Sequence, residues 1–434
     1  MTPSEATPSG PIVPFGRAMR DAYFCFSPDY HPLNHGSYGT YPTTVRQAHQ
    51  ALQALVESAP DRFIALDWPS RLSESRTLTA AFLHCPAASV VFVPNATTGI
   101  ETVLKNLVFA PGDVVLVYEC IYASVRANLA WLEETTPLRV EVVAIPFPVG
   151  DDAFVEAMVG AARAINAGAN GRGERVRLAI VDVVVSLPGL RTPFERLVPA
   201  LQAEGALVLV DGAHGIGHVE MDVQRLDPDF LVTNPYKWLF VPRGAAVVYV
   251  PARHQRLIRA SVPTSARLRG VGDETPGAFI SLFDYIAAID NTNLLTIKAA
   301  LDFRTEICGG EAAIRSYSQS IAREGASIAS SILGTEVMDL PSSSSSSCMR
   351  DCNFANVRVP LHDIPPSHAD QVILWLKTTG TRESGCYFQI CFYRGVFWWR
   401  LSGTVYVDVE DFRKGAVVLG GLCERVARGE YLLS

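Results

Sequence analysis

The 434-residue sequence has no apolar run of membrane-spanning length and no excess of basic residues. Its formal net charge of −7 gives no positive footprint for nucleic acid, so we expect no nucleic-acid partner. The first residues, MTPSEATPSG, are rich in proline and serine and lack the apolar core of a secretory signal. These absences predict a cytoplasmic protein with no membrane partner, in which the first residues are disordered.

Motifs for a metal site or a dinucleotide are lacking as well. The nine cysteines are scattered and odd in number, without a CxxC pair, and Cys348 and Cys352 have no histidine nearby at zinc spacing. No G-x-G-x-x-G follows an early strand, which argues against a dehydrogenase-like enzyme. We therefore expect reduced thiols and no metal ion.

What the chain does contain is a globular composition and a regular alternation of elements. Hydrophobic residues make up 48% and charged residues 19%, and 434 residues are too many for one small core. Apolar strands alternating with helices predict an α/β fold with a mostly parallel sheet covered on both faces. The expected strands are residues 90–93, 113–118, 140–145, 178–185, 207–210, 230–233, 245–250, 354–359 and 396–402. The expected helices include 43–57, 70–83, 100–107, 194–204, 296–306, 314–332, 369–378 and 411–428, with a polar helix from Arg253.

The most informative stretch is residues 207–239, LVLVDGAHGIGHVEMDVQRLDPDFLVTNPYKWL. One buried strand ends at Asp211 with His214 close behind, and a second leads to Tyr236 and Lys237. Pyridoxal phosphate needs an amine to hold its aldehyde as an imine and a carboxylate to keep its pyridine nitrogen protonated. We interpret Lys237 as that amine and Asp211 as that carboxylate, with His214 beside the ring or phosphate. Taken singly, the ordinary alternatives are a capping aspartate and a solvated lysine.

The D-G-A-H sequence followed by the Lys–Trp pair resembles the class V aminotransferase family of fold-type I pyridoxal phosphate enzymes. This family includes cysteine desulfurases and isopenicillin N epimerases. The resemblance implies the cofactor pyridoxal 5'-phosphate, a small amino-acid substrate and a homodimer. It also implies a seven-stranded type of sheet sandwiched by helices and a smaller α+β C-terminal domain. We place an N-terminal segment at 1–30, the large cofactor-binding domain at 31–290 and the small domain at 291–434.

Further cofactor contacts follow from the resemblance. Ala96, Thr97 and Thr98, in a small-residue loop before a helix, correspond to the loop that holds the cofactor phosphate; without the family, an ordinary helix cap would be the better explanation. Tyr122 stands where the family stacks a ring on the cofactor, and it could also offer a phenolic proton during catalysis. The alternative for it is a core tyrosine.

Two more cofactor contacts are expected at the end of the strand before residue 186. Ser186 stands where the family contacts the pyridine hydroxyl, and Asp182 is a further candidate. Tyr236, next to Lys237, completes the expected cofactor set.

Substrate contacts are expected from both ends of the chain. Asn34, His35 and Gly36 match the N-H-G-S loop of epimerase-like members, which lies over the active site; by itself the loop is only a turn. Arg400 ends an apolar strand in an R-x-S element, where the family holds the substrate carboxylate by a bidentate pair. The alternative for Arg400 is a surface residue at a strand end.

The sequence departs from the family pattern at the residues that bear on the expected dimer. Relatives often carry G-T-x-D where this chain has Ala287-Ala288-Ile289-Asp290, and their threonine reaches the phosphate of the neighbouring subunit. The missing hydroxyl weakens, without removing, the expectation of a homodimer that shares its two active sites.

Within the family, the N-H-G-S loop and Tyr122 favour the epimerase-like branch, and the whole pattern is similar to the fungal hercynylcysteine sulfoxide lyases of ergothioneine biosynthesis. The implied reaction is β-elimination from a cysteine S-conjugate sulfoxide, giving a sulfenic acid, pyruvate and ammonia. A desulfurase, an epimerase, an aminotransferase and a cofactor-fold binding module remain as alternatives. Cys386, in Ser-Gly-Cys, would be the desulfurase thiol, although its aromatic neighbours suggest packing.

Overall fold

The structure is a computed structural model, and it describes residues 10–168, 171, 173–262, 277–340 and 347–433. Most of the N-terminal segment expected to be disordered lies outside the described residues. That expectation remains a prediction.

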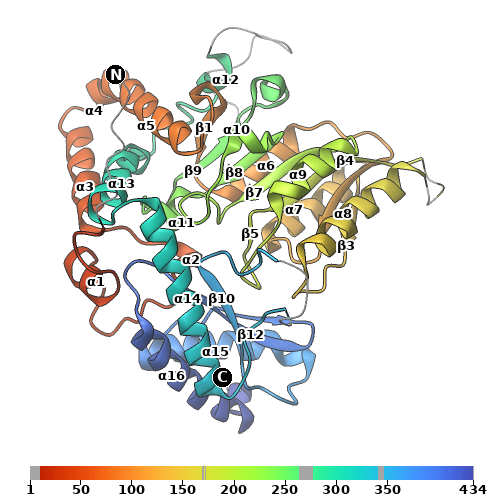
Figure 1. The fold of residues 1–434 in the computed structure, drawn as a ribbon. Helices are drawn as coiled ribbons and strands as arrows, with labels where there is room; N and C mark the ends of the chain where they lie inside the picture. Colours follow the sequence, from red (N-terminus) through yellow and green to blue (C-terminus); the bar gives the residue numbers. More distant parts are fainter. Residues whose placement is uncertain (1–9, 169–170, 172, 263–276, 341–346, 434) are drawn as a thin grey trace.

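A seven-stranded sheet forms the centre of the molecule (Figure 1), in the order β1-β9-β8-β7-β4-β2-β3. Its strands are β1 (Val90–Val93), β2 (Asp113–Tyr118), β3 (Arg139–Val143), β4 (Arg175–Asp182), β7 (Leu207–Gly212), β8 (Phe230–Thr233) and β9 (Ala246–Tyr249). The pairs from β8 through β7, β4 and β2 to β3 are parallel, and β9 runs antiparallel to β8 and β1. Apolar β-branched runs such as Val114–Val117 are buried because helices cover both faces. The predicted α/β fold with a mostly parallel sheet is confirmed.

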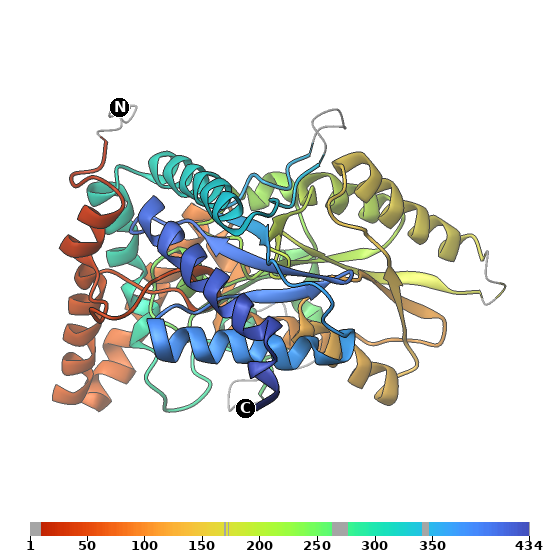
Figure 2. The ribbon, with the colours of Figure 1, turned by 90° about the horizontal axis from the view of Figure 1, so that it is seen from below.

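Helices flank this sheet on both sides. Figure 2 shows α8 and α9 on one side of the sheet and α7 on the other. The helices of this part are α3 (Thr43–Ser58), α5 (Trp68–Phe82), α6 (Ala96–Asn106), α7 (Ala123–Thr135), α8 (Asp151–Asn166) and α9 (Phe194–Ala203). Shorter turns of helix are α2 (His35–Tyr38), α4 (Pro60–Arg62), α10 (Val223–Leu226), α11 (Pro235–Trp238) and α12 (Ala278–Ser281).

A separate three-stranded sheet, β10-β12-β11, builds the smaller C-terminal domain. It comprises β10 (Phe354–Arg358), β11 (Ile390–Tyr393) and β12 (Val396–Ser402), with helices α14 (Glu311–Leu333), α15 (Ala369–Ser384) and α16 (Val409–Ala427). Met19 of α1 (Arg17–Tyr23), Phe24 and Leu33 are buried in the same apolar core as this sheet. The start of the described chain therefore packs with its end. The domain boundaries given above stay predictions.

A short hairpin joins the two parts. Its strands β5 (Val184–Val185) and β6 (Leu190–Arg191) follow β4, and Gly189 lies between them. The Asn356 side chain of β10 accepts a hydrogen bond from Gly189 N and donates one to Gly189 O, each at 2.9 Å. The small domain is thus fixed to a loop that leaves the large sheet at the carboxyl end of β4.

Several predicted element boundaries were wrong. Helix α6 begins at Ala96 instead of residue 100, because Asn95 caps it by accepting from Thr98 N at 2.8 Å. The expected long helix 296–306 divides into a 3₁₀ turn, the short α13 (Ile297–Asp302) and a π turn, and the polar helix at Arg253 is a 3₁₀ turn. The N-H-G-S turn closes into one turn of helix, α2.

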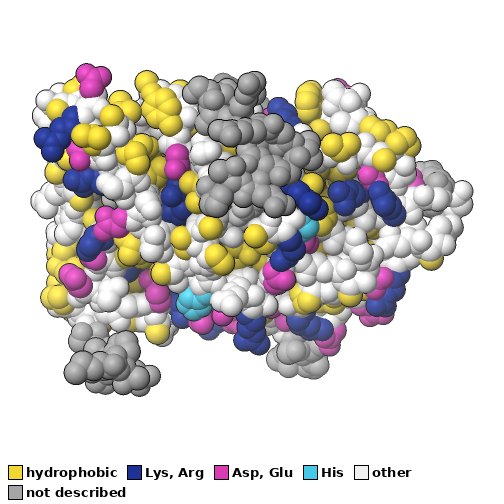
Figure 3. Space-filling view, turned by 90° about the horizontal axis from the view of Figure 1, so that it is seen from above, with side chains coloured by type: hydrophobic (Ala, Val, Ile, Leu, Met, Phe, Trp, Pro, Cys, Tyr) yellow, Lys and Arg dark blue, Asp and Glu magenta, His cyan; other side chains and the backbone are white. Residues whose placement is uncertain are grey.

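Surface charges of both signs are interspersed on the face shown in Figure 3. No helix among the described residues is long and apolar enough to cross a membrane.

Gly39 allows α2 to lie against α11, which carries Lys237. Its φ is +61°, and a Cβ atom built there would lie 1.9 Å from Tyr236 O. We expect Gly39→Ala to lower the free energy of unfolding by about 2–5 kcal/mol, from backbone strain and overpacking together. Urea unfolding measures this. Gly205→Ala is the matched control, because the φ of Gly205 is +83° but nothing lies near the added Cβ. Its free energy of unfolding should fall only by the contribution of backbone strain. Equal losses in the two variants would show that the contact with α11 is unimportant.

Candidate active site

A cavity opens at the carboxyl ends of the parallel strands, where open α/β sheets bind their ligands. Its lining residues come from five different strand ends or loops and are Asn95, Ala96, Thr97, Ile100, Tyr122, Asp182, Ser186, Asp211, Ala213, His214, Asn234, Tyr236 and Lys237. Nine of the fourteen predicted site residues are in this set; Thr98, Asn34, His35, Gly36 and Arg400 are not.

Lys237 lies in the single helical turn α11, directly after β8 and Asn234. Asn234 Oδ1 accepts from Ala96 N at 2.9 Å, which ties this turn to the start of α6. Burial lowers the pKa of Lys237 to about 7, because an ammonium loses its hydration there. A lysine whose amine form is well populated at neutral pH is suited to attack an aldehyde.

Asp182 and Asp211 lie side by side at the ends of β4 and β7, as partners in the parallel register. Asp182 accepts from Tyr118 Oη at 2.5 Å, and Asp211 Oδ1 accepts from Ala213 N at 2.9 Å. Burial raises the pKa of Asp182 well above its ordinary value, and the charge of Asp211 adds to this. Burial also raises the pKa of Asp211. Two adjoining buried carboxyl groups favour a protonated ring nitrogen as a third partner.

The Asp211 carboxylate is the one available for that partner. Within the described chain its Oδ2 has no hydrogen-bond donor, whereas Asp182 is already engaged by a phenol. His214 also faces the site, and its Nε2 lies 3.0 Å from Lys237 Nζ. The residues present therefore fit a pyridine ring held between strand ends and an amine.

The first turn of α6 supplies the part of the cavity suited to an anion. Ala96 and Thr97 line it, and the helix dipole favours a phosphate there, together with the Thr97 amide, which has no acceptor among the described residues, whereas the amides of Ala96 and Thr98 donate to Asn234 and Asn95. Thr98 is different, since its amide and hydroxyl both donate to Asn95 Oδ1, at 2.8 and 3.1 Å. The structure thus gives Thr98 a capping contact and leaves it off the cavity wall.

Arg400 reaches the site from β12 of the small domain and is 1% exposed. Its guanidinium donates to Ser186 O at 2.7 Å, Ser37 Oγ at 2.9 Å and Asn34 Oδ1 at 3.1 Å. It also stacks on the Phe354 ring, with its Cζ 4.3 Å from the centroid. Burial lowers the pKa of Arg400 to about 10. The alternative explanation of Arg400 as a surface residue at a strand end is therefore wrong.

All those partners of Arg400 are neutral, and its buried Nε has no acceptor among the residues that the structure describes. A buried cation without an anionic partner is costly. The arrangement is therefore suited to a carboxylate-bearing ligand.

The N-H-G-S residues lie differently from expectation. Asn34 bonds Arg400, but the His35 ring is buried against Trp238, and its Nδ1 lies 2.7 Å from Tyr406 Oη. Burial lowers the pKa of His35 to about 3. A Cβ at Gly36 would lie 2.3 Å from the Phe354 ring. His35 and Gly36 therefore pack behind the site, because α2 turns them inward, and the structure places neither on the cavity.

Tyr122, Ser186 and Tyr236 line the cavity as expected for cofactor contacts. Tyr122 precedes α7 and is 45% exposed, so the alternative of a core tyrosine is wrong. Ser186 accepts from Arg400 through its backbone oxygen at 2.7 Å. Their contacts to a bound cofactor stay predictions.

Sequence reasoning missed several residues that the site uses. Ser37 and Phe354 hold Arg400, Tyr118 bonds Asp182, and Asn234 connects the lysine turn to α6. Asn234, at a strand end beside Lys237, and Ser37, in the N-H-G-S motif, could have been found from the local sequence, whereas Tyr118 and Phe354 depend on contacts between distant segments.

Cys386 is fully buried beside an isolated β-bridge to His31, and burial raises its pKa. A nucleophilic thiolate needs access and a lowered pKa, so this geometry suits packing. Across the described ranges, no group of three or more His, Cys, Asp or Glu could hold a metal ion.

Comparison with known proteins places these features in one family. The aminotransferase class V model matches residues 46–269, over half of the chain. An L-cysteine desulfhydrase-like protein, lolT1, of Epichloe uncinata is 36% identical, across 96% of this chain and 98% of its own. The chain belongs to the aminotransferase class V family. Membership confirms the resemblance and the cofactor it implied, pyridoxal phosphate.

A second relative, the hercynylcysteine sulfoxide lyase of Schizosaccharomyces pombe, is 29% identical over 94% of this chain and 98% of its own. Among solved structures, that of the cystine C-S lyase C-DES in complex with its product cysteine persulfide has a TM-score of 0.70. It is 19% identical and covers 90% of this chain and 97% of its own, which confirms the fold.

Proposed function

We propose that this class V enzyme is a pyridoxal-phosphate-dependent carbon–sulfur lyase that cleaves a cysteine S-conjugate sulfoxide by β-elimination, with hercynylcysteine sulfoxide as the substrate. The assignment of an amino-acid substrate rests on one observation: the guanidinium of Arg400 is buried, and its hydrogen-bond partners are all neutral. The sulfoxide assignment is supported by the 29% identical lyase, and carbon–sulfur cleavage by the desulfhydrase-like relative.

Each residue has a definite task in this proposal. When bound, the cofactor supplies an electron sink for a carbanion at the substrate Cα. Arg400 holds the substrate carboxylate, and the Lys237 amine takes the Cα proton onto Nζ. The Cβ–S electron pair leaves with sulfur as a sulfenate. Tyr122, at the exposed side of the cavity, orients or protonates that sulfur, and water releases pyruvate and ammonia.

The main alternative is a cysteine desulfurase, which removes sulfur with a cysteine thiolate of its own. The buried position of Cys386 disfavours that reaction, since a loop thiol must reach the substrate sulfur. An epimerase or aminotransferase would use the same lysine. A binding module without activity has no use for Lys237 held as an amine.

Pyruvate release separates these reactions. The pyridoxal-phosphate-loaded protein is given hercynylcysteine sulfoxide, a simple S-alkyl cysteine sulfoxide and free cysteine in parallel. We expect pyruvate from the first at the highest kcat/KM, and Cys386→Ser should retain that activity. Alanine and persulfide from cysteine, lost in Cys386→Ser, would overturn the lyase proposal.

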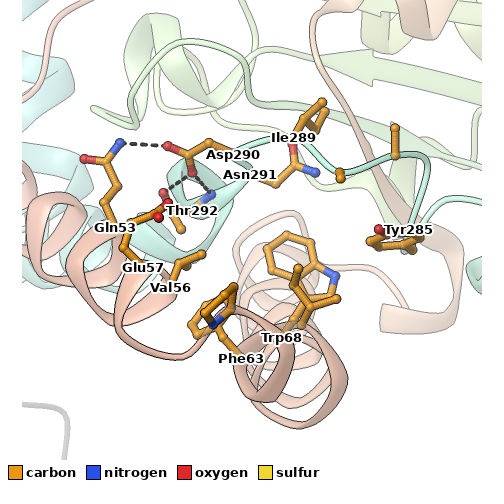
Figure 4. A pocket seen from close by; sticks show the side chains of 14 residues that line it. Gln53, Val56, Glu57, Phe63, Trp68, Tyr285, Ile289, Asp290, Asn291 and Thr292 are labelled. Carbon is orange, nitrogen blue, oxygen red and sulfur yellow. Dashed lines mark hydrogen bonds between the residues drawn. The ribbon is translucent and has the colours of Figure 1, made fainter.

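We further propose that the protein is a homodimer whose interface includes the apolar hollow in Figure 4. Phe63 and Trp68 face Tyr285 and Ile289 across it, while Asp290 accepts from Gln53 Nε2 at 2.7 Å and holds the 285–292 segment in place. Tyr285 and Ile289 are 49% and 56% exposed. Exposed apolar surface of this kind marks partner sites. A second copy is the occupant favoured here, since the family's neighbouring-subunit contact falls at 287–290.

Ile289→Asp is expected to convert the dimer to monomer, because a charge would be desolvated in the interface. Size-exclusion chromatography with light scattering measures this at micromolar protein. Leu374→Asp, at an exposed aliphatic residue of the small domain, should leave the mass unchanged. A monomeric wild-type protein would contradict the proposal.

A cytoplasmic location remains part of the proposal, supported by the nine free cysteines, which suit a reducing compartment. Imaging of a fluorescent fusion in the native cell tests it.

A further inference from the structure

Four buried rings pack beneath the Lys237 amine. His214 lies edge-on to Phe354, with ring centroids 5.2 Å apart, and His218 stacks on Trp238 at 4.1 Å. Trp238 comes from the same helical turn as Lys237, and Phe354 comes from the small domain. Such tight packing leaves the two imidazole rings little freedom to turn.

Two hydrogen-bond donors of fixed chemistry meet these imidazoles. The indole Nε1 of Trp238 can only donate, and it lies 3.2 Å from His214 Nδ1. The backbone N–H of Asn353 can also only donate, and it lies 2.7 Å from His218 Nε2. Each donor therefore requires an unprotonated ring nitrogen opposite it.

Both histidines are neutral in this environment. Burial lowers the pKa of His218 to about 3 and that of His214 well below its ordinary value. A neutral imidazole carries one N–H, so the proton of His218 is on Nδ1, which donates to His214 O at 2.8 Å. By the same reasoning the proton of His214 is on Nε2.

That proton points at the lysine. His214 Nε2 lies 3.0 Å from Lys237 Nζ, and two donors facing each other at this distance would repel. The contact is favourable only when Nζ offers a lone pair, which means that Lys237 is an amine. The direction of the hydrogen bonds thus runs from Trp238 through His214 to Lys237.

We propose that Trp238 is a positioning residue: its indole N–H fixes the tautomer of His214, and His214 then donates to Lys237 and keeps that side chain an amine. The functional consequence of this inference rests on the proposed function, in which Lys237 is the cofactor amine. The tautomer itself follows from the geometry.

Other charges near Lys237 act in both directions. Asp211 and Asp182 favour its ammonium form, whereas burial and the positive charge of Arg400 oppose it. His35, whose ring centroid lies 4.8 Å from that of Trp238, is uncharged, because burial lowers its pKa to about 3. A donor aimed at Nζ adds to burial and to the charge of Arg400, and all three oppose the ammonium form that the two carboxyl groups favour.

Loss of the indole N–H should favour the ammonium form of Lys237 over the amine. In Trp238→Phe, His214 Nδ1 can take the proton, and Nε2 then accepts from a lysine ammonium. We expect the pH midpoint for capture of pyridoxal phosphate by Lys237 to rise by about one unit, which is roughly a fivefold slower capture at the wild-type midpoint.

The capture assay uses full-length, cofactor-free protein mixed with pyridoxal phosphate, trapped with borohydride and quantified on the Lys237 peptide by mass spectrometry. Trp375→Phe, which removes a buried tryptophan of the small domain, should keep the wild-type midpoint. An unchanged midpoint in folded Trp238→Phe would overturn the proposal.

A second measurement does not depend on any variant folding. Nitrogen-15 NMR of histidine-labelled, cofactor-free wild-type protein distinguishes protonated from unprotonated ring nitrogens. We expect His214 to be protonated on Nε2 and unprotonated on Nδ1 at neutral pH. The opposite tautomer would overturn the inference, and this result stands whether or not Lys237 proves to be the cofactor amine.

Discussion

Lys237→Ala is expected to give a folded protein that releases no measurable pyruvate. The substitution removes both the group proposed to hold the cofactor and the base for the Cα proton, so activity should fall at least about a thousandfold. Borohydride reduction of the loaded protein, followed by peptide mass spectrometry, should find the cofactor on Lys237 in the wild type and on no peptide in the variant.

Lys105→Ala serves as the matched control, since Lys105 lies on the surface of α6 and pairs with Glu101. It should retain the covalent cofactor and the activity. A cofactor still linked covalently in Lys237→Ala would show that another lysine holds it. In the wild type, covalent capture should accelerate as the pH rises through about 7, because burial lowers the pKa of Lys237 to about 7 and only the amine attacks.

Arg400→Lys is expected to lower kcat/KM by roughly 30- to 5,000-fold, the equivalent of about 2–5 kcal/mol for a buried charge pair that loses its geometry. A lysine keeps the charge but not the planar fork that matches a carboxylate. Most of the loss should appear in KM, because the carboxylate is held both before and during reaction.

Steady-state kinetics with the best sulfoxide substrate measures this effect. Arg413→Lys, at an exposed arginine of α16, should be neutral. An unchanged KM in Arg400→Lys would show that the substrate carboxylate binds elsewhere. The absorbance of the bound cofactor checks that the variant still assembles its site.

Asp211 and Lys237 could be predicted because their signals are local: each follows a short apolar strand, and both lie in one stretch of chain. The cavity then forms where the strands end together. The sheet was predictable for the same reason, since most of its strands contain uninterrupted apolar runs, β3 (RVEVV) being the exception. The sequence-based family resemblance supplied Arg400, which lies far along the chain.

What could not be predicted depends on contacts between distant segments. Ser37 and Phe354 touch Arg400 from distant parts of the chain. Ser37 ends the N-H-G-S motif, but the motif does not indicate a contact with Arg400, and Phe354 stands in no recognisable pattern. His35 was expected to face the substrate, yet a single turn of helix directs it into the core. The start of α6 was misplaced because Thr97 and Thr98 suggested a loop, whereas the Asn95 cap begins the helix earlier.

The two hydrogen bonds between Asn356 and Gly189 have a consequence for selectivity. They hold the small domain beside Ser186, so the orientation of Arg400 is established during folding and costs a ligand little conformational entropy. A preorganised clamp of this kind accepts the common amino-acid portion of any substrate almost equally well. For the proposed reaction we therefore expect discrimination between cysteine and its larger conjugates to arise at the sulfur end, on the exposed side where Tyr122 lies, and in the rate of bond cleavage more than in the initial association.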